Sequence, residues 1–411
     1  MILGFSLASY SVVGNDVIQT LGTFISSNSK RKWYVLWAYI GGLFFVVAAY
    51  AWFQLEGDIA YGRLDKIPFP KEYAWWLALP PLILVIITRF GIPVSTTFLI
   101  LSVFSAKNIE SMVTKSLLGY LTAFIAAIVL YLLISKRLEK YFISTSDKYQ
   151  MFTETSGNQT LVRAIFNFLV AVGLGILTFQ LVSSYHVVEG IFGAEAYKTY
   201  RLFVLKNVLA AVVVVPAFIV LHRQGLSTYR NQRDEYISNS WMVGQWLSTG
   251  FLWTQWIVQD MANIFVYLPR HGNLQAGGYW LAIILLIALL GYILYQKGGG
   301  IQKIVTTKTN TFDIRSATII DATYGIILFI FKEYSKIPMS TTWVFVGLLA
   351  GRELAITYQL RRNEAGSFRS VIGVVLKDLA KIFLGLAVSL VLALAITENA
   401  VKDYIVKLLG L

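Results

Sequence analysis

Residues 90–99 read FGIPVSTTFL, and residues 336–345 repeat the same pattern as KIPMSTTWVF. Each copy lies between apolar runs. A helix that only fills a bilayer has no need of a proline and three consecutive hydroxyl side chains, because its backbone groups pair within the helix. The two copies of Pro-x-Ser-Thr-Thr therefore indicate an irregular backbone and a polar site in apolar surroundings, formed twice in one chain.

The composition is that of an integral membrane protein. Hydrophobic residues make up 56% of the 411 residues and charged residues only 14%, whereas about a quarter of the residues in soluble domains are charged. We therefore predict one membrane domain embedded in the lipid bilayer. The net charge of +13 comes from loops that flank apolar runs, which is an orientation signal, so no nucleic-acid partner is indicated. Cysteine is absent, which excludes thiolate catalysis and cysteine metal sites.

Eight apolar stretches are long enough to cross a bilayer, which takes about 20 residues of helix. They cover residues 2–27, 33–53, 113–135, 160–185, 200–222, 240–268, 276–296 and 370–398. The stretches that hold the Ser-Thr-Thr segments differ from these. In the first, Gly91 and Pro93 divide the apolar run into arms too short to span singly, which predicts a re-entrant hairpin of two half-helices.

The basic loops indicate the orientation in the membrane. We place Lys30, Arg31 and Lys32 in the cytoplasm and let both hairpins return to the side that they left. Every strongly basic loop then falls on the cytoplasmic side, and both termini are external. The loop that contains Asp58 and Asp65 is external and solvated on this topology, or else covers the hairpin.

A second pair of motifs accompanies the first: GNDVIQT at residues 14–20 and VQDMANI at residues 258–264. Asp16 lies 79 residues before Ser95 (95 − 16), and Asp260 lies 80 before Ser340 (340 − 260). The predicted topology runs the two motif helices in opposite directions, which is the pattern of an inverted repeat. We assign residues 1–135 to the first repeat, 136–239 to connecting helices and loops, and 240–411 to the second repeat. The predicted fold class is an all-α inverted-repeat secondary transporter with about eight spanning helices and two re-entrant helical hairpins.

Each Ser-Thr-Thr segment follows an Ile-Pro pair. Proline is favoured at the first position of a helix, so we expect the second arm of each hairpin to begin at or near Pro93 and Pro338. Its first-turn amides lack partners within the helix and, with the positive end of the helix dipole, form an anion site. The hydroxyls add donors, and we expect the two segments to hold one small tetrahedral oxyanion from both sides. The candidate anion-binding residues are Ser95, Thr96, Thr97, Ser340, Thr341 and Thr342.

Asp16 and Asp260 have the complementary role. A carboxylate at the centre of a membrane helix costs about 2.5 to 3.5 kcal/mol on insertion scales, so it is seldom found without a cation or a proton as partner. Neighbouring amide oxygens, and carbonyls freed where the helix breaks at Gly14, suit a hard cation that prefers oxygen ligands. The candidate cation-binding residues are Asn15, Asp16, Gln19, Gln259, Asp260 and Asn263. Sodium is the natural candidate, protons on the aspartates are the alternative, and we expect no cofactor beyond the transported ion.

The paired motifs resemble those of the inorganic phosphate transporter (PiT) family. Each half of that family carries Gly-x-Asn-Asp-x-x-Asn in a first helix and Pro-x-Ser-Thr-Thr-His in a hairpin. The corresponding residues here read VGNDVIQ and IVQDMAN, then IPVSTTF and IPMSTTW, in an order and spacing that cover nearly the whole chain. The resemblance implies symport of inorganic phosphate with sodium or protons by a multi-pass protein of the plasma (inner) membrane, and it suggests a homodimer. It also implies cation binding at the Asn/Asp positions and anion binding at the Ser-Thr-Thr positions.

Four positions depart from the family pattern. Gln19 and Gln259 stand where the family has Asn, and Phe98 and Trp343 stand where it has His. Glutamine keeps an amide oxygen on a side chain that is one methylene longer, which leaves open the number and identity of the coupled cations. The loss of both histidines removes two hydrogen-bond donors near the anion, so sulfate stays open beside phosphate.

We predict a secondary active symporter that takes up inorganic phosphate with sodium by alternating access. The alternatives are a proton-coupled phosphate symporter and a transporter of sulfate or another small oxyanion. An anion channel would have no reason to keep two carboxylates in the membrane. An enzyme acting on phosphate esters would need a nucleophile with a base, or a metal cluster, and neither accompanies the motifs. A transport-dead sensor would show altered motif residues, as this chain does.

Overall fold

The structure of the protein is a computed structural model. It describes residues 2–70, 75–89, 95–105, 108–135, 228–230, 236–270, 273–296, 314–334, 336–360 and 365–396. The chain divides into two compact units, one formed by Met1–Tyr141 with Ser248–Leu411 and the other by Phe142–Leu247. Both Ser-Thr-Thr segments and both aspartate motifs belong to the first unit.

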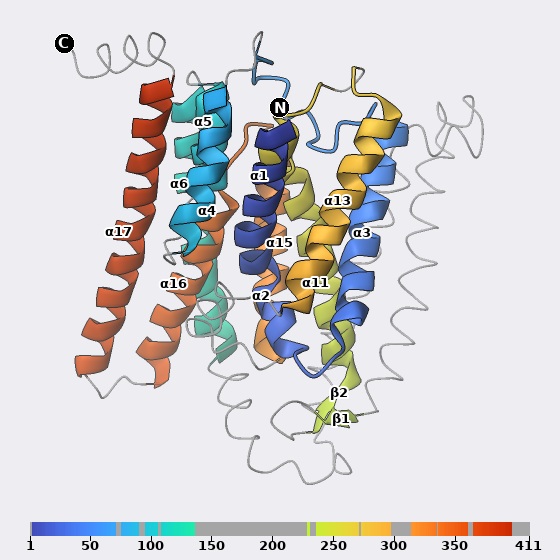
Figure 1. Ribbon diagram of the computed structural model, residues 1–411. Helices are drawn as coiled ribbons and strands as arrows, with labels where there is room; N and C mark the ends of the chain where they lie inside the picture. Colours follow the sequence, from blue (N-terminus) through green and yellow to red (C-terminus); the bar gives the residue numbers. More distant parts are fainter. Residues whose placement is uncertain are drawn as a thin grey trace, which may run out of the picture. The chain divides into compact units, whose positions relative to one another are not determined.

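The described part of the first unit is built from helices (Figure 1). In the N-terminal half these are α1 (Ile2–Val12), the π-helical turn η1 (Val13–Val17), α2 (Ile18–Ser27), α3 (Trp33–Gln54), the 3₁₀ turn η2 (Trp75–Ala78), α4 (Leu79–Arg89), the π-helical turn η3 (Thr97–Leu101), α5 (Ser102–Phe104) and α6 (Ile109–Ser135). In the C-terminal half they are α11 (Asn239–Asp260), which enters the unit at Ser248, α12 (Ala262–Phe265), α13 (Ala276–Tyr295), α15 (Ile314–Tyr334), α16 (Thr341–Leu360) and α17 (Ala365–Ile396).

Six of the eight predicted apolar stretches correspond to described helices. They are residues 2–27 (α1, η1 and α2), 33–53 (α3), 113–135 (α6), 240–268 (α11 and α12), 276–296 (α13) and 370–398 (α17). The stretches at 160–185 and 200–222 lie outside the described residues. Within the described part of the chain, three helical segments are long and apolar enough to cross a membrane by themselves: Trp33–Gln54, Ile109–Leu132 and Ala276–Tyr295.

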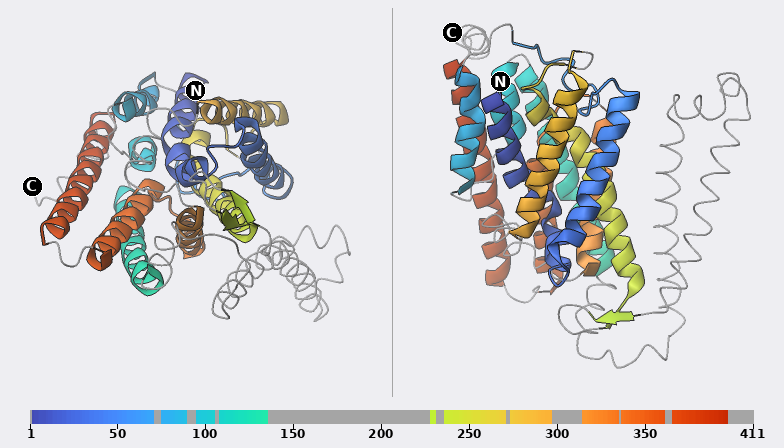
Figure 2. Two further views of the ribbon diagram at one scale, coloured as in Figure 1. Left: turned by 90° about the horizontal axis from the view of Figure 1, so that it is seen from below. Right: turned by 45° about the vertical axis from the view of Figure 1, so that its right-hand side comes forward.

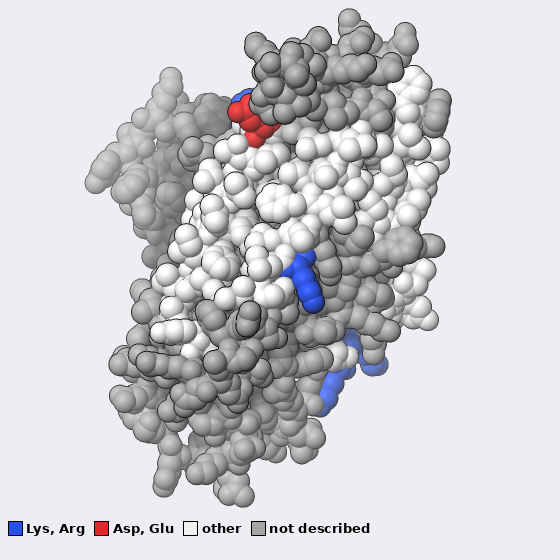
Figure 3. Space-filling model, turned by 90° about the vertical axis from the view of Figure 1, so that its left-hand side faces the viewer, with Lys and Arg blue, Asp and Glu red and all other residues white. Residues whose placement is uncertain are grey.

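Burial in the first unit is inverted relative to a water-soluble protein. Large apolar side chains face outward, with Leu281 69% exposed and Val46 60% exposed, while the carboxylates of Asp16 and Asp260 are buried. Figure 3 shows a broad face on which the described side chains are uncharged except at isolated positions. An uncharged face together with many exposed large apolar side chains marks a contact with another apolar phase. Together with the apolar helices, it identifies an integral membrane protein.

The helices beside the two Ser-Thr-Thr segments differ in length. Before and after the first segment, α4 has 11 residues, η3 has 5 and α5 has 3, all well short of the about 20 that span a bilayer. Residues 90–94 lie outside the described residues. Beside the second segment, α15 has 21 residues and α16 has 20, about 30 Å each. Neither α15 nor α16 contains a proline to end it early, so the helices beside the second segment are longer than those beside the first.

Helices α6 and α16 approach each other most closely at two glycines of α16. A Cβ added to Gly347 would lie 2.5 Å from the carbonyl oxygen of Tyr120, and one added to Gly351 would collide with the carbonyl oxygen of Phe124. Glycines four residues apart allow membrane helices to pack backbone against backbone. Because α16 follows the second Ser-Thr-Thr segment directly, this contact holds that segment in place against α6.

The two aspartate motifs lie on helices of opposite direction (Figures 1 and 2). The α1–η1–α2 run carries Asp16, and α11 carries Asp260 at its C-terminal end. Elsewhere in this unit α3 packs along α13, where the indole nitrogen of Trp37 donates a hydrogen bond to the carbonyl oxygen of Ile287 at 2.9 Å. Opposite helix directions are what an inverted repeat requires.

A short antiparallel hairpin is added to the predicted helical fold. Strands β1 (Thr228–Arg230) and β2 (Tyr236–Ser238) belong to the second unit and pair with Tyr229 opposite Ile237. Their sequences, TYR and YIS, contain the aromatic and β-branched residues that favour strands. The prediction had included these residues among connecting helices and loops. The hairpin occupies only six residues, and the described fold remains helical.

Candidate functional site

Asp16 lies at a local widening of its helix. The backbone of Val13–Val17 forms the π-helical turn η1 between α1 and α2, and such turns occur frequently at functional sites because they leave backbone groups without their regular partners. The side-chain amide nitrogen of Asn15 donates a hydrogen bond to Asp16 Oδ1 at 2.7 Å, and that of Gln19 donates to Asn15 Oδ1 at 3.0 Å. The remaining polar atom, Gln19 Oε1, is buried and has no hydrogen-bond partner among the described residues. We call Asn15, Asp16 and Gln19 the first half-site.

Asp260 occupies the equivalent place in the other half, where α11 ends and Met261 separates it from α12. Asn263 on α12 donates to Asp260 Oδ1 at 3.1 Å. Its own carbonyl oxygen, Oδ1, is buried and lacks a hydrogen-bond partner within the described part of the chain. We call Gln259, Asp260 and Asn263 the second half-site. Each half-site therefore combines one buried carboxylate with one unpartnered amide oxygen.

The serines of the Ser-Thr-Thr segments cap the helices that follow. Ser95 Oγ accepts a hydrogen bond from the amide of Phe98, and Ser340 Oγ accepts one from the amide of Trp343, both at 3.3 Å. This is the bond that an N-cap serine makes to the amide three residues later. Helix α16 begins at Thr341, so the prediction that this helix starts near Pro338 is wrong by about one turn. The reason is that Ser340 is the better N-cap.

The threonines that follow each cap reach the aspartates. Thr96 donates its hydroxyl proton to Asp16 Oδ2, and Thr341 donates to Asp260 Oδ2 at 2.6 Å. The same contact is thus made in both halves between residues 80 and 81 positions apart in the sequence. Residues predicted separately for anion and cation binding are directly hydrogen-bonded to each other. We name these two bonds the threonine–aspartate contacts.

The two halves also meet across the site. Asn263 donates to the hydroxyl oxygens of Thr96 at 3.0 Å and Thr97 at 3.4 Å, and Thr97 donates to the carbonyl oxygen of Met339 at 3.2 Å. The amide of Ser340, which the sequence left free for an anion, donates instead to Ser116 Oγ on α6 at 2.8 Å. The structure therefore brings the Ser-Thr-Thr segments and the half-sites into one buried polar cluster.

Phe98 and Trp343 meet where the PiT pattern has two histidines. Their ring centroids are 5.2 Å apart with planes inclined at 70°, an edge-to-face geometry favoured by aromatic pairs. Both side chains are buried. An apolar contact between these two aromatic side chains thus takes the position at which the resemblance places hydrogen-bond donors.

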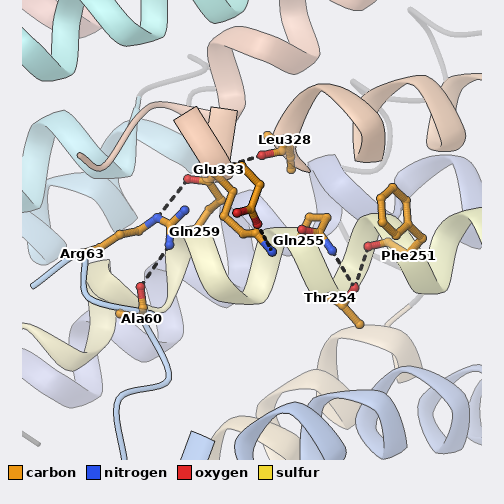
Figure 4. A network of polar contacts seen from close by, with 9 residues as sticks. Ala60, Arg63, Phe251, Thr254, Gln255, Gln259, Leu328 and Glu333 are labelled. Atoms are coloured by element: carbon orange, nitrogen blue, oxygen red, sulfur yellow. Dashed lines mark hydrogen bonds and ion pairs between the residues drawn. The ribbon is translucent and has the colours of Figure 1, made fainter. Parts of the chain in front are cut away.

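Arg63 is a member of the cluster that sequence reasoning missed. The loop between α3 and α4 was expected to be solvated, yet the Arg63 side chain is only 1% exposed. Its Nε donates to Gln259 Oε1 and its Nη1 to the carbonyl oxygen of Ala60, both at 3.1 Å (Figure 4). Burial lowers the pKa of the Arg63 guanidinium to about 10, while the carboxylates of Asp260 and Asp58 act to raise it. Arg63 is therefore cationic at neutral pH.

The loop backbone turns Arg63 inward. Asp58 accepts hydrogen bonds from the amide of Ala60, at 3.1 Å, and from the amide of Gly62. Tyr61 and Gly62 adopt left-handed conformations with φ of 58° and 77°, which favours glycine and is uncommon for tyrosine. In EGDIAYGRLD (residues 56–65), Asp58 and Gly62 are a local signal of a tight turn. They do not indicate which side chain of the loop the turn would bury.

Asp321 is a third buried carboxylate, and the sequence analysis did not select it. It lies on α15 and accepts hydrogen bonds from Thr23 on α2 and Thr249 on α11. The argument applied to Asp16 was available for it, since IIDATYGIILFI (residues 319–330) places a carboxylate inside an apolar run. Both of its carboxylate oxygens have protein partners, and its contacts join three helices.

Among the described residues, no group of three or more His, Cys, Asp or Glu side chains is placed to hold a metal ion. The donors that do come together are two carboxylates, amide oxygens and threonine hydroxyls. Oxygen ligands of this kind suit a hard cation, and helix N-termini with hydroxyls suit an anion. The cluster is therefore chemically equipped to bind ions of both signs next to each other.

Comparison with known proteins gives a likeness in fold. No family model matches the chain, and no curated protein matches its sequence. A solved structure described as the sodium-dependent phosphate transporter is 17% identical, with 99% of this chain and 98% of that chain covered and a TM-score of 0.63. The protein thus shares, over nearly its full length, the fold of a solved transporter.

Proposed function

We propose that this protein is a secondary active symporter that takes up inorganic phosphate with sodium across the plasma membrane by alternating access. The observation that carries the proposal is the pair of threonine–aspartate contacts. They join the candidate anion site to the candidate cation site at the same place in both halves, as coupled transport requires. The inverted repeat, the two hairpins and the assignment of residues 1–135 and 240–411 to the repeats belong to this proposal, as does a homodimer.

The Ser-Thr-Thr segments are proposed to bind the phosphate. Both are N-capped by serine, so the first-turn amides behind the caps carry the positive end of a helix dipole. The hydroxyl of Thr342 can donate to the anion. The hydroxyls of Thr96, Thr97 and Thr341 add donors once they are released from Asp16, Met339 and Asp260. A tetrahedral oxyanion presents acceptor oxygens in all directions and suits donors converging from two helices better than a planar anion does.

The half-sites are proposed to bind the cation. Among the residues described, the side-chain amide oxygens of Gln19 and Asn263 have no hydrogen-bond partner. They lie in the same hydrogen-bonded groups as the two carboxylates. An unsatisfied buried oxygen is costly unless a ligand completes it. A sodium ion would satisfy these oxygens and reduce the negative charge of two carboxylates in one cluster.

Coupling follows from the single proton of each threonine hydroxyl. While Thr96 or Thr341 donates to its aspartate, that hydroxyl cannot donate to an anion. A cation bound to the carboxylate competes for the same oxygens and frees the hydroxyl to turn toward phosphate. Cation and anion then favour each other's binding, both through the released donors and through their opposite charges.

The deciding experiment is uptake into proteoliposomes of labelled phosphate and, separately, labelled sulfate. Each is measured with an inward sodium gradient and then with a proton gradient alone. Accumulation of phosphate above equilibrium, driven by sodium, is the expected result. Sulfate accumulation would move the proposal to another oxyanion, and proton-driven phosphate uptake would change the coupled ion. Movement only down the anion gradient would indicate a channel, and no movement of either anion would indicate a sensor.

A further inference from the structure

The two half-sites are not equivalent, and the difference lies at the residue before each aspartate. In the first half-site Asn15 turns toward Asp16 and donates to its carboxylate at 2.7 Å. In the second half-site Gln259 turns away from Asp260. Its Oε1 accepts the hydrogen bond from Arg63, and its Nε2 donates to the carbonyl oxygen of Leu328 at 3.1 Å. Figure 4 shows Gln259 held between Arg63 on one side and α15 on the other.

The partner of Gln259 is a permanent cation inside the cluster. Arg63 is buried, and the charge of Asp260 acts on it. Its third nitrogen, Nη2, is buried without a hydrogen-bond partner among the described residues. A buried guanidinium with an unused donor needs a neighbouring negative charge. The carboxylates of Asp260, Asp58 and Glu333 all act on it, and a bound oxyanion would add a further negative group.

We propose that Arg63 is a built-in cation of the second half-site, so that the protein couples phosphate uptake to a cation bound at the first half-site alone. The inference rests on the proposed function. An amide oxygen already engaged by a guanidinium is lost as a sodium ligand, and the guanidinium repels a second cation beside Asp260. The first half-site holds no arginine or lysine, and it keeps Gln19 Oε1 unpartnered among the described residues. The built-in charge also attracts the anion.

The proposal predicts that removing the charge of Arg63 creates a cation site. Arg63→Gln frees Oε1 of Gln259 and removes the repulsion, so a second sodium ion should bind beside Asp260. Lys66→Gln is the matched control, because Lys66 is an exposed residue of the same loop and its replacement removes the same charge. Arg63→Lys keeps a cation in place and should therefore bind a single sodium ion, whatever its rate of uptake.

The experiment counts sodium ions bound to the purified full-length protein with radioactive sodium at saturating phosphate. In parallel, the sodium dependence of phosphate uptake is measured in proteoliposomes, where the Hill coefficient cannot exceed the number of coupled sites. We expect a single ion and a Hill coefficient of about 1 for the wild type, Lys66→Gln and Arg63→Lys. For Arg63→Gln we expect a second ion and a coefficient approaching 2.

Two bound ions in the wild type would overturn the inference while leaving sodium-coupled phosphate transport intact. A folded Arg63→Gln protein that binds a single ion, with phosphate uptake retained, would overturn it as well. If Arg63→Gln fails to fold, the number of sodium ions bound by the wild type and by Arg63→Lys still tests the inference. Two bound sodium ions in either protein would contradict a built-in cation at Arg63. Absence of sodium binding together with absence of sodium-driven uptake in the wild type would instead reject the proposed function, and the inference with it.

Discussion

Asp16, Asp260 and Asp321 are all buried and all accept hydrogen bonds from threonine, but their surroundings differ. Asp16 and Asp260 belong to groups that contain an unpartnered amide oxygen, judged over the described residues. Asp321 is bonded by Thr23 and Thr249 through both of its oxygens. Polar side chains that satisfy one another between membrane helices usually hold the helices together. Each of the three carboxylates has a donor on both oxygens, so what sets Asp16 and Asp260 apart, within the described part of the chain, is the unpartnered amide oxygen in the same hydrogen-bonded group, which a transported cation would complete.

The first prediction separates these roles by isosteric substitution. Asp16→Asn and Asp260→Asn each remove one negative charge from the cluster, and we expect the rate of sodium-driven phosphate uptake to fall at least tenfold, which corresponds to about 1.4 kcal/mol or more. Asp321→Asn is the control, since it also removes a buried carboxylate bonded to threonine. It should retain sodium-dependent uptake and lose thermal stability. Wild-type uptake by either Asp16→Asn or Asp260→Asn would refute the proposed cation role.

At the scale of the helices, the second Ser-Thr-Thr segment depends on how closely α16 approaches α6. The absence of side chains at Gly347 and Gly351 lets the α16 backbone lie against carbonyl oxygens of α6. Ser116 on the same α6 helix accepts a hydrogen bond from the backbone amide of Ser340. The helix contact and the position of the N-cap are therefore linked, because moving α16 outward would withdraw Ser340 from its partner.

The second prediction concerns this contact. Gly351→Ala places a methyl group against the backbone of Phe124, where no side chain can yield, and we expect a loss of about 1 to 3 kcal/mol of stability. Gly42→Ala on α3 is the control: no atom lies within 4 Å of the added Cβ, so helix propensity alone should give a gain of about 0.5 to 1 kcal/mol. Thermal unfolding in detergent measures both. Equal melting temperatures for the two variants would contradict the proposed packing.

At the scale of the whole molecule, α1 begins at the end of the first unit where α17, its last described helix, ends. In Figure 1 the start of α1 and the end of α17 lie at the same end of the helical array, and the segment between α2 and α3 lies at the opposite end. That segment contains Lys30, Arg31 and Lys32. Basic residues remain preferentially in the cytoplasm, which places both ends of the helical array outside.

The third prediction tests this orientation. A reporter that is active only in the cytoplasm should be silent when fused after Leu411 and active when inserted after Lys32, because the positive-inside rule assigns these positions to opposite sides. The two fusions share the same chain, so expression of full-length protein is compared by immunoblot. Reporter activity at Leu411 with silence at Lys32 would reverse the orientation, and activity at both would refute the predicted topology.

Sequence patterns anticipated the helices and the local motif chemistry better than the contacts between distant segments. Apolar runs predicted most of the described helices because lipid contact demands a continuous apolar stretch. The motifs also led to Thr96 and Asp16, 80 residues apart, which meet in the structure. The start of α16 was misplaced because proline competes with Ser340, whose capping bond depends on the folded backbone.

Arg63 was beyond the reach of the sequence because a basic residue in a loop usually faces water. Its burial depends on the left-handed backbone at Tyr61 and Gly62 and on Gln259, which is 196 residues away. The argument that applies to Asp16 applies equally to Asp321, a carboxylate inside an apolar run. Asp321 has no counterpart in the other half, so a search for repeated motifs does not identify it. Neither hydrophobic periodicity nor the local spacing of motifs encodes which distant residues form contacts in the fold.

The amide of Asn263 is shared between its own half, through Asp260, and the other half, through Thr96 and Thr97. The proposed alternating access requires the halves to shift against each other, so in that mechanism these bonds would be broken and remade in every cycle. Their strength then sets part of the activation barrier rather than the affinity for either ion. A side chain that binds weakly across this boundary would favour rapid turnover, and one that binds tightly would hold the transporter in a long-lived closed state.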